Sequence, residues 1–156
     1  MKHPPRIQRL IESRDLEVIE PDPERIAGLW KKALASNEDS RRGLSPDNAI
    51  SLAYQAGFQA CTALLEAHGY RTKGSNPGHH YRVFYAASGL GYPELSDVHT
   101  TSEKVKAERT KSFYSGDPQD AAQVDALHQW LDGILPAVYH ALTRAAAELP
   151  VTLRKP

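Results

Sequence analysis

A permanently charged arginine occupies an apolar position in a predicted helix. Over residues 97–115 one helix face is formed, at intervals of four, three, four and four, by Val98, Ser102, Val105, Arg109 and Phe113. Because arginine does not lose its charge inside a protein, Arg109 needs an acceptor: a carboxylate, a carbonyl or a phosphate. Two interpretations therefore stand side by side, a structural ion pair within the protein and a binding site for an anion.

Tyr114 lies in the last turn of the same predicted helix, since a glycine and a proline follow it closely. At 100° per residue it is roughly 140° round the helix from Arg109, and it aligns instead with Lys106 and Thr110. We therefore expect Arg109 and Tyr114 to reach one site only if the last turn unwinds or if two copies of the helix meet in a dimer.

A second concentration of chemistry lies in residues 67–93, which contain no Asp or Glu but five tyrosines or phenylalanines. A basic surface rich in aromatic side chains is typical of phosphate and base contacts. A solvated loop followed by a packed short helix is the alternative. On the first interpretation, the residues predicted to contact RNA or a nucleotide are Arg71, Lys73, His79, His80 and Arg82, together with Lys106 and Lys111 of the 97–115 helix.

Composition excludes several classes of protein. The 156 residues are enough for one domain with a real core. Lys+Arg and Asp+Glu both number 19, so no global field attracts nucleic acid or a membrane surface. The lone Cys61 excludes an intramolecular disulfide framework, and it matches no standard zinc spacing with the nearby histidines. We expect no metal and no cofactor. With no apolar leader and no membrane-length stretch, we expect a soluble cytoplasmic protein.

Helical periodicity runs through most of the chain, and no convincing strand pattern appears. The predicted helices cover residues 6–14, a segment that opens at Asp22 and Pro23, a segment from Ser45 and Pro46 to just before Gly69, residues 79–88, residues 97–115, and a last long helix that contains Pro136. Residues 1–156 thus form one domain. Residues 1–20 are an N-terminal helix and linker, and residues 22–149 form an all-α antiparallel bundle of four to five helices.

The chain resembles the HEPN domains (higher eukaryotes and prokaryotes nucleotide-binding) of the bacterial standalone type. The resemblance rests on the stretch "LSPDNAISLAYQAGFQACTALLEAHGYRTKGSNPGHHYRVF", the run "ERTKSFYSGD" and the long amphipathic last helix. It covers most of the chain, because the opening "IQRLIESRDLEVIEPDPERIAGLWKKA" is similar to the N-terminal helix and linker of such members. It implies an all-α bundle, often homodimeric, and many members act as metal-independent ribonucleases.

The resemblance also implies roles for three residues. Members that cleave RNA carry an arginine, often followed by a polar residue, and a histidine four to six positions later, and two protomers bring these motifs together. By position Arg109 matches the arginine, Thr110 the polar residue, and Tyr114 stands where the histidine would be. A tyrosine, with an ordinary pKa near 10, is a weaker base at neutral pH than a histidine near 6.5. Whether the protein is an endoribonuclease is therefore left open, with His79 or His80 as another source of the acid–base group.

Two functions follow as expectations. The first is an RNA- or nucleotide-binding homodimer, with the ribonuclease or toxin component of a toxin–antitoxin or defence pair as its active form. The second is a catalytically inactive bundle that binds a protein partner, such as a nucleotidyltransferase or an antitoxin, with Arg109 in a structural ion pair.

Overall fold

The computed structural model describes residues 2–75, 78–145 and 153–156. Within these residues the chain is mainly helical, which confirms the all-α class. The elements are α1 (Pro5–Glu12), β1 (Leu16–Val18), α2 (Pro23–Asp39), α3 (Pro46–Ala67), β2 (Tyr70–Thr72), α4 (His79–Ser88), the 3-10 turn η1 (Pro93–Leu95), α5 (Val98–Ser115) and α6 (Ala121–Ala145).

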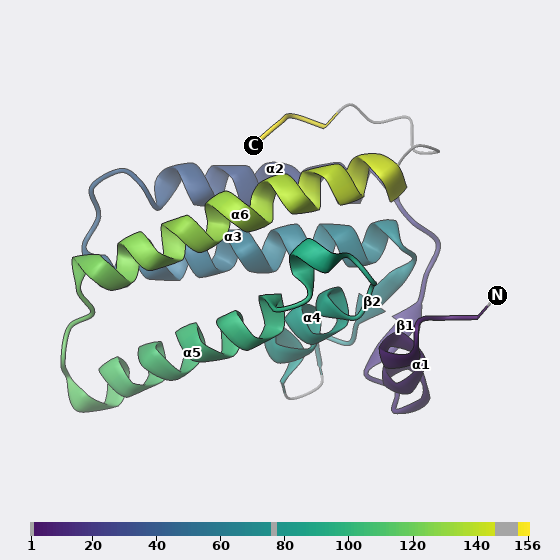
Figure 1. Ribbon diagram of the computed structural model, residues 1–156, viewed down its shortest axis with the longest axis horizontal. Helices are drawn as coiled ribbons and strands as arrows, with labels where there is room; N and C mark the ends of the chain where they lie inside the picture. Colours follow the sequence, from purple (N-terminus) through teal and green to yellow (C-terminus); the bar gives the residue numbers. More distant parts are fainter. Residues whose placement is uncertain (1, 76–77, 146–152) are drawn as a thin grey trace.

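The long helices α2, α3 and α6 lie side by side and form the core, with α3 in contact with both of the others (Figure 1). The small residues predicted to line one face of α3 are buried, among them Ala53, Gly57 and Ala60. Gly57 is required by a close approach, because a Cβ at this position would lie only 2.7 Å from the indole ring of Trp130 in α6. The absence of a side chain at Gly57 is what lets the Trp130 ring of α6 lie so close to the α3 backbone.

Neighbouring helices are not all antiparallel, which corrects the predicted bundle. α2 and α5 run in one direction and α3 and α6 in the other, so the adjacent helices α3 and α6 are parallel (Figure 1). The physical reason is the connection between them: β2, α4 and α5 carry the chain back to the end of the molecule at which α3 began.

The predicted helix signals are confirmed at several positions. Asp22 caps α2, and its carboxylate accepts hydrogen bonds from the backbone N–H groups of Glu24 and Arg25 at 3.1 and 3.3 Å. The chain leaves α3 through Gly69, whose φ of +83° lies in the left-handed region that favours glycine. Pro136 lies within α6, as predicted.

The expectation of no strands was wrong at one place. β1 pairs antiparallel with β2, so that Leu16 faces Thr72 and Val18 faces Tyr70. Strands of three residues are too short to show an alternating pattern, and their pairing depends on contacts far apart in the sequence. This small sheet fastens the N-terminal linker to the end of α3.

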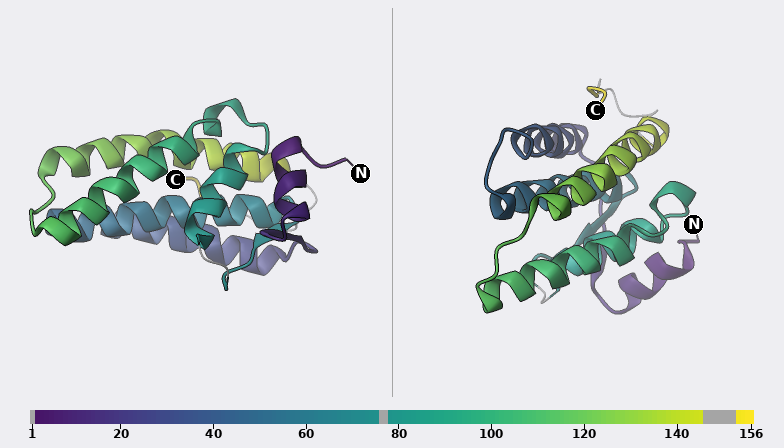
Figure 2. Two further views of the ribbon diagram at one scale, coloured as in Figure 1. Left: turned by 90° about the horizontal axis from the view of Figure 1, so that it is seen from below. Right: turned by 60° about the vertical axis from the view of Figure 1, so that its left-hand side comes forward.

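The C-terminal half of α5 projects away from the three core helices (Figure 2). α5 packs mainly against α4 and makes few contacts with α3. Val98 and Ser102 are buried and Val105 packs partly against the core, whereas Phe113 is 81 % exposed. The predicted inward face is therefore inward only in the first half of the helix, because α5 diverges from the core before it reaches Phe113. Arg109, four residues before Phe113, still contacts Ser51 and Tyr54 of α3.

Candidate functional site

Arg109 is half-buried and is held by α3. Its Nη2 donates a hydrogen bond to the Ser51 hydroxyl at 3.3 Å, and its guanidinium carbon lies 5.1 Å from the centre of the Tyr54 ring. Among the described residues, no carboxylate lies within ion-pair distance of this guanidinium. A hydroxyl and an aromatic ring thus hold the side chain in place without neutralising its charge.

Arg109 lines a cleft of about 710 Å³ bounded by the second half of α5, the loop that leads to α6, and the first turns of α3. The lining residues are Asp47, Ser51, Lys106, Arg109, Thr110, Ser112, Phe113, Tyr114, Gly116, Asp117, Pro118 and Gln119. The structure thus brings Arg109, Thr110 and Tyr114 together with Lys106 in one cleft of one chain.

This differs from the expectation that Arg109 and Tyr114 meet only through unwinding or a dimer. The helix stays intact up to Ser115, and the chain then reverses at Gly116, where φ is +73°. The loop is fastened to α3 because the Asp47 carboxylate accepts a hydrogen bond from the backbone N–H of Gln119 at 3.2 Å. The cleft follows the loop round the end of α5, so residues on two faces of the helix line it.

Charges in the lining are balanced. Lys106 and Arg109 supply two cations, and Asp47 and Asp117 supply two carboxylates. A ligand would therefore be held by short-range contacts with Arg109 and the neighbouring hydroxyls rather than by a broad positive field.

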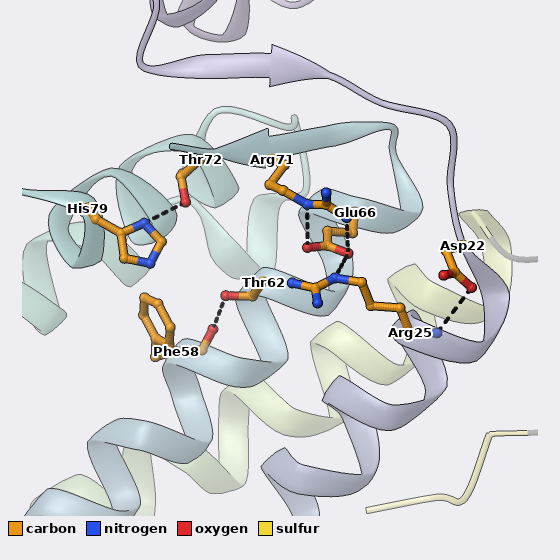
Figure 3. A network of polar contacts seen from close by, with 8 residues as sticks. All are labelled: Asp22, Arg25, Phe58, Thr62, Glu66, Arg71, Thr72 and His79. Atoms are coloured by element: carbon orange, nitrogen blue, oxygen red, sulfur yellow. Dashed lines mark hydrogen bonds and ion pairs between the residues drawn. The ribbon is translucent and has the colours of Figure 1, made fainter. Parts of the chain in front are cut away.

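His79 and His80, at the start of α4, behave differently from each other. His79 is fixed: its Nδ1 hydrogen-bonds the Thr72 hydroxyl at 2.7 Å, and its ring lies edge-on to Phe58 (Figure 3). His80 is exposed, and it stacks on Phe58 with ring centres 4.3 Å apart and planes tilted by 21°. The two side chains flank the same aromatic ring of α3.

Partial removal of the rings from water lowers the pKa of both histidines. For His80 the pKa is lowered further by His79 and by the positive charges of Lys106 and Arg109. His80 is therefore close enough to the cleft to feel its cations, and its ring is neutral at pH 7.

Two of the other predicted RNA contacts already have carboxylate partners. Arg71 pairs with Glu66 at 3.1 Å, and Arg82 pairs with Asp15 at 2.9 Å. Glu66 is only 1 % exposed and also accepts a 2.7 Å hydrogen bond from Arg25, which raises the pKa of Arg25 (Figure 3). These arginines neutralise acids of the protein itself.

Lys73 and Lys111 lie outside the cleft. Lys73 is half-buried just after β2, and Lys111 is exposed on α5 but absent from the cleft lining. Their predicted contact with RNA stays a prediction, as it does for Arg71 and Arg82. Of the cations named from the sequence, only Lys106 and Arg109 lie at the cleft.

Sequence reasoning missed four residues that shape these sites: Asp47, Ser51, Tyr54 and Glu66. Glu66 had a detectable signal, because it is an acid among apolar residues in "CTALLEAHGY", on the helix expected to have a close neighbour. Ser51 and Tyr54 gave none, because serine and tyrosine are ordinary residues in such a helix. Their role depends on which helix packs above them.

No protein-family model, curated protein or solved structure matches the chain. The HEPN resemblance thus stays a prediction.

None of the described helices combines the length and the apolar character needed to cross a bilayer. In the same described ranges, no three His, Cys, Asp or Glu side chains are grouped to hold a metal ion. Cys61 lies in the core, where burial raises the pKa of its thiol to about 12.

Proposed function

We propose that the protein binds the phosphate of RNA or of a nucleotide in the cleft beside Arg109. The observation that carries this proposal is a half-buried guanidinium that faces the cleft and has no carboxylate within ion-pair distance among the described residues. Removing such a charge from water is unfavourable unless an acceptor replaces the water. A phosphate that accepts two N–H groups of the guanidinium meets this need with strong, charge-assisted hydrogen bonds.

The neighbouring groups support the same ligand. Lys106 is a second cation at the cleft, and Ser51 and Thr110 also line it, with hydroxyls of the kind that donate hydrogen bonds to phosphate oxygens. Tyr114 is exposed at the end of the cleft, where its ring is available to a base or a ribose.

Cleavage of RNA is the catalytic extension of this proposal, as the HEPN resemblance implies. It requires a group that exchanges protons near neutral pH, and His80 meets this requirement better than Tyr114 does. In this version Arg109 and Lys106 stabilise the negative charge that develops on the phosphate, and no metal ion takes part.

The test compares the wild type with Arg109→Met, which keeps the length and apolar contact of the side chain and removes its charge. Arg42→Met is the matched control, because Arg42 is an exposed arginine that pairs with Asp39 at the end of α2. We expect Arg109→Met to weaken binding of a fluorescent oligoribonucleotide by at least about 10-fold, the loss typical of a charged hydrogen-bonded contact, in the presence of a chelator. Gel analysis of the same samples reports cleavage. Wild-type affinity in Arg109→Met would overturn the proposal.

A second candidate function is contact with another protein, and one observation favours it. Phe113 and Tyr114 are each 81 % exposed, and their ring centres are 5.3 Å apart at the edge of the cleft. Adjacent exposed aromatic rings are typical of interface residues. We propose a second copy of the chain as the partner, in preference to a nucleotidyltransferase or an antitoxin.

Light scattering tests the dimer. We expect a dimer at micromolar concentration for the wild type, and a shift towards monomer for Phe113→Ser. A wild-type protein that stays monomeric would exclude this second function and would leave phosphate binding untouched.

A further inference from the structure

We infer that His80, stacked on Phe58, is a platform for a nucleobase beside the Arg109 phosphate site. The ligand class is therefore a base that carries a phosphate, in a free nucleotide or at an RNA strand, rather than a phosphate or a phosphosugar alone. This inference rests on the function proposed above and assigns the base a place of its own.

The first support is the geometry of the rings. His80 and Phe58 are nearly parallel at 4.3 Å, and the half-buried Phe58 packs in turn against the buried Phe84 with ring centres 6.2 Å apart. His79 meets the His80 ring edge-on at 5.3 Å and is itself held by Thr72. Among the described residues, only Phe58 and His79 make ring contacts with His80, and His80 is exposed to solvent. A rigid, exposed aromatic face is what a base stacks upon.

The second support is the spacing along α3. Arg109 lies on the ring of Tyr54, and His80 lies on the ring of Phe58, four positions later. Four residues of an α-helix advance by about 6 Å, so the phosphate site and the stacking face lie on neighbouring turns of one rigid helix.

The third support is the charge state of the platform. The pKa of His80 is lowered by partial removal of the ring from water, and also by His79, Lys106 and Arg109, so the ring is neutral at pH 7. A neutral ring does not compete with Arg109 for the phosphate. It acts as an aromatic surface, and the phosphate remains with the two cations.

The test measures three ligands by calorimetry: ribose 5-phosphate, AMP and an oligoribonucleotide. The variants are His80→Ala, His80→Phe and, as the matched control, His140→Ala, since His140 is an exposed histidine beside the ring of Tyr139 on α6. We expect His80→Ala to weaken AMP and oligoribonucleotide binding by about 5- to 150-fold, the factor for one base–aromatic stack. Binding of ribose 5-phosphate stays unchanged, His80→Phe retains wild-type affinity, and His140→Ala changes nothing.

The two sources of the base give separate results that both support the inference. Equal affinities for AMP and the oligoribonucleotide indicate a free nucleotide, and a much tighter oligoribonucleotide indicates RNA. The inference is overturned if His80→Ala weakens all three ligands equally, if His80→Phe binds as poorly as His80→Ala, or if the wild type binds AMP no better than ribose 5-phosphate. In these cases the phosphate site still stands as long as Arg109→Met abolishes binding. A wild type that binds none of the ligands removes both proposals.

Discussion

Arginines from other elements contact α3 near both of its ends, and their partners differ between the two ends. Towards the C-terminal end, Arg25 and Arg71 converge on the buried carboxylate of Glu66 (Figure 3). Towards the N-terminal end, Arg109 has the hydroxyl of Ser51 and the ring of Tyr54. Arg25 and Arg71 therefore share a carboxylate partner. Arg109 has no carboxylate within ion-pair distance in the described part of the chain.

The difference shows what makes an arginine available to a ligand. Burial does not decide it, because the Arg25 and Arg71 side chains are 49 % and 37 % exposed and still have their partner. The presence of a carboxylate decides it, because a paired guanidinium has already exchanged water for an anion. The cluster at Glu66 is therefore structural, whereas Arg109, on our proposal, is available to an external anion.

The largest effect is expected at the Glu66 end. Replacing both Arg25 and Arg71 by Met leaves a buried carboxylate without a cation, which lowers the free energy of unfolding by about 3 kcal/mol. This is the lower end of the usual range, because water reaches both arginine side chains. Urea denaturation measures the loss, and we expect it to exceed the sum of the two single variants, since each single variant keeps one partner.

Adding Glu66→Met to that double variant provides the control. With the carboxylate gone, no buried charge is left unpaired, and most of the lost stability should return. A triple variant as unstable as the double variant would show that packing of the arginine stems, and not charge pairing, holds this region together.

The second prediction concerns stability at the other end. Arg109→Met should change the free energy of unfolding by less than about 1 kcal/mol, because only one hydrogen bond and one cation–π contact are lost. Millimolar phosphate should raise the melting temperature of the wild type but not that of Arg109→Met, since a ligand stabilises only a state that binds it. A loss of 3 kcal/mol or more without ligand would mean that Arg109 is a structural residue after all.

A smaller effect is expected at Asp47, whose carboxylate opposes a phosphate in the cleft. Asp47→Asn keeps an oxygen that accepts the Gln119 N–H and removes the negative charge. We expect phosphate affinity to rise by about 1.5- to 5-fold, as for a partly exposed charge pair. Calorimetry checks this, with Asp125→Asn on α6 as a control outside the cleft lining. A decrease in affinity would indicate that Asp47 itself binds the phosphate, either by sharing a proton with it or through a cation that bridges the two.

The smallest effect concerns pH and His68, which lies at the Glu66 end of α3. Burial lowers the pKa of His68, whose Nε2 hydrogen-bonds the Tyr92 hydroxyl at 2.8 Å. The unfolded chain then binds a proton that the folded chain does not, so stability falls as the pH drops from about 6.5 towards the folded-state pKa. His68→Gln cannot take up this proton and still reaches Tyr92. We expect its melting temperature to decrease less between pH 7.5 and 5.5 than that of the wild type; equal decreases would remove His68 as a cause.

Much of the fold could be predicted because its signals are local. Asp22 before Pro23, glycine after the end of α3 and Gly116 after α5 act on the backbone next to them, whatever the rest of the chain does. The apolar spacing and the small residues of α3 likewise indicated helices and a close neighbour. The β1–β2 pair could not be found this way, because three-residue strands depend on a partner more than 50 residues away.

The sequence alone determined that an arginine stands on the apolar side of α5 and needs an acceptor, because helical spacing and a permanent charge are properties of the chain itself. Which acceptors lie near that arginine depends on how the helices pack. Packing placed Glu66 beneath Arg25 and Arg71, and it placed Ser51 and Tyr54, with no carboxylate, beneath Arg109. An ion pair needs two groups within a few ångströms, and that distance is set by how helices cross rather than by how residues follow one another.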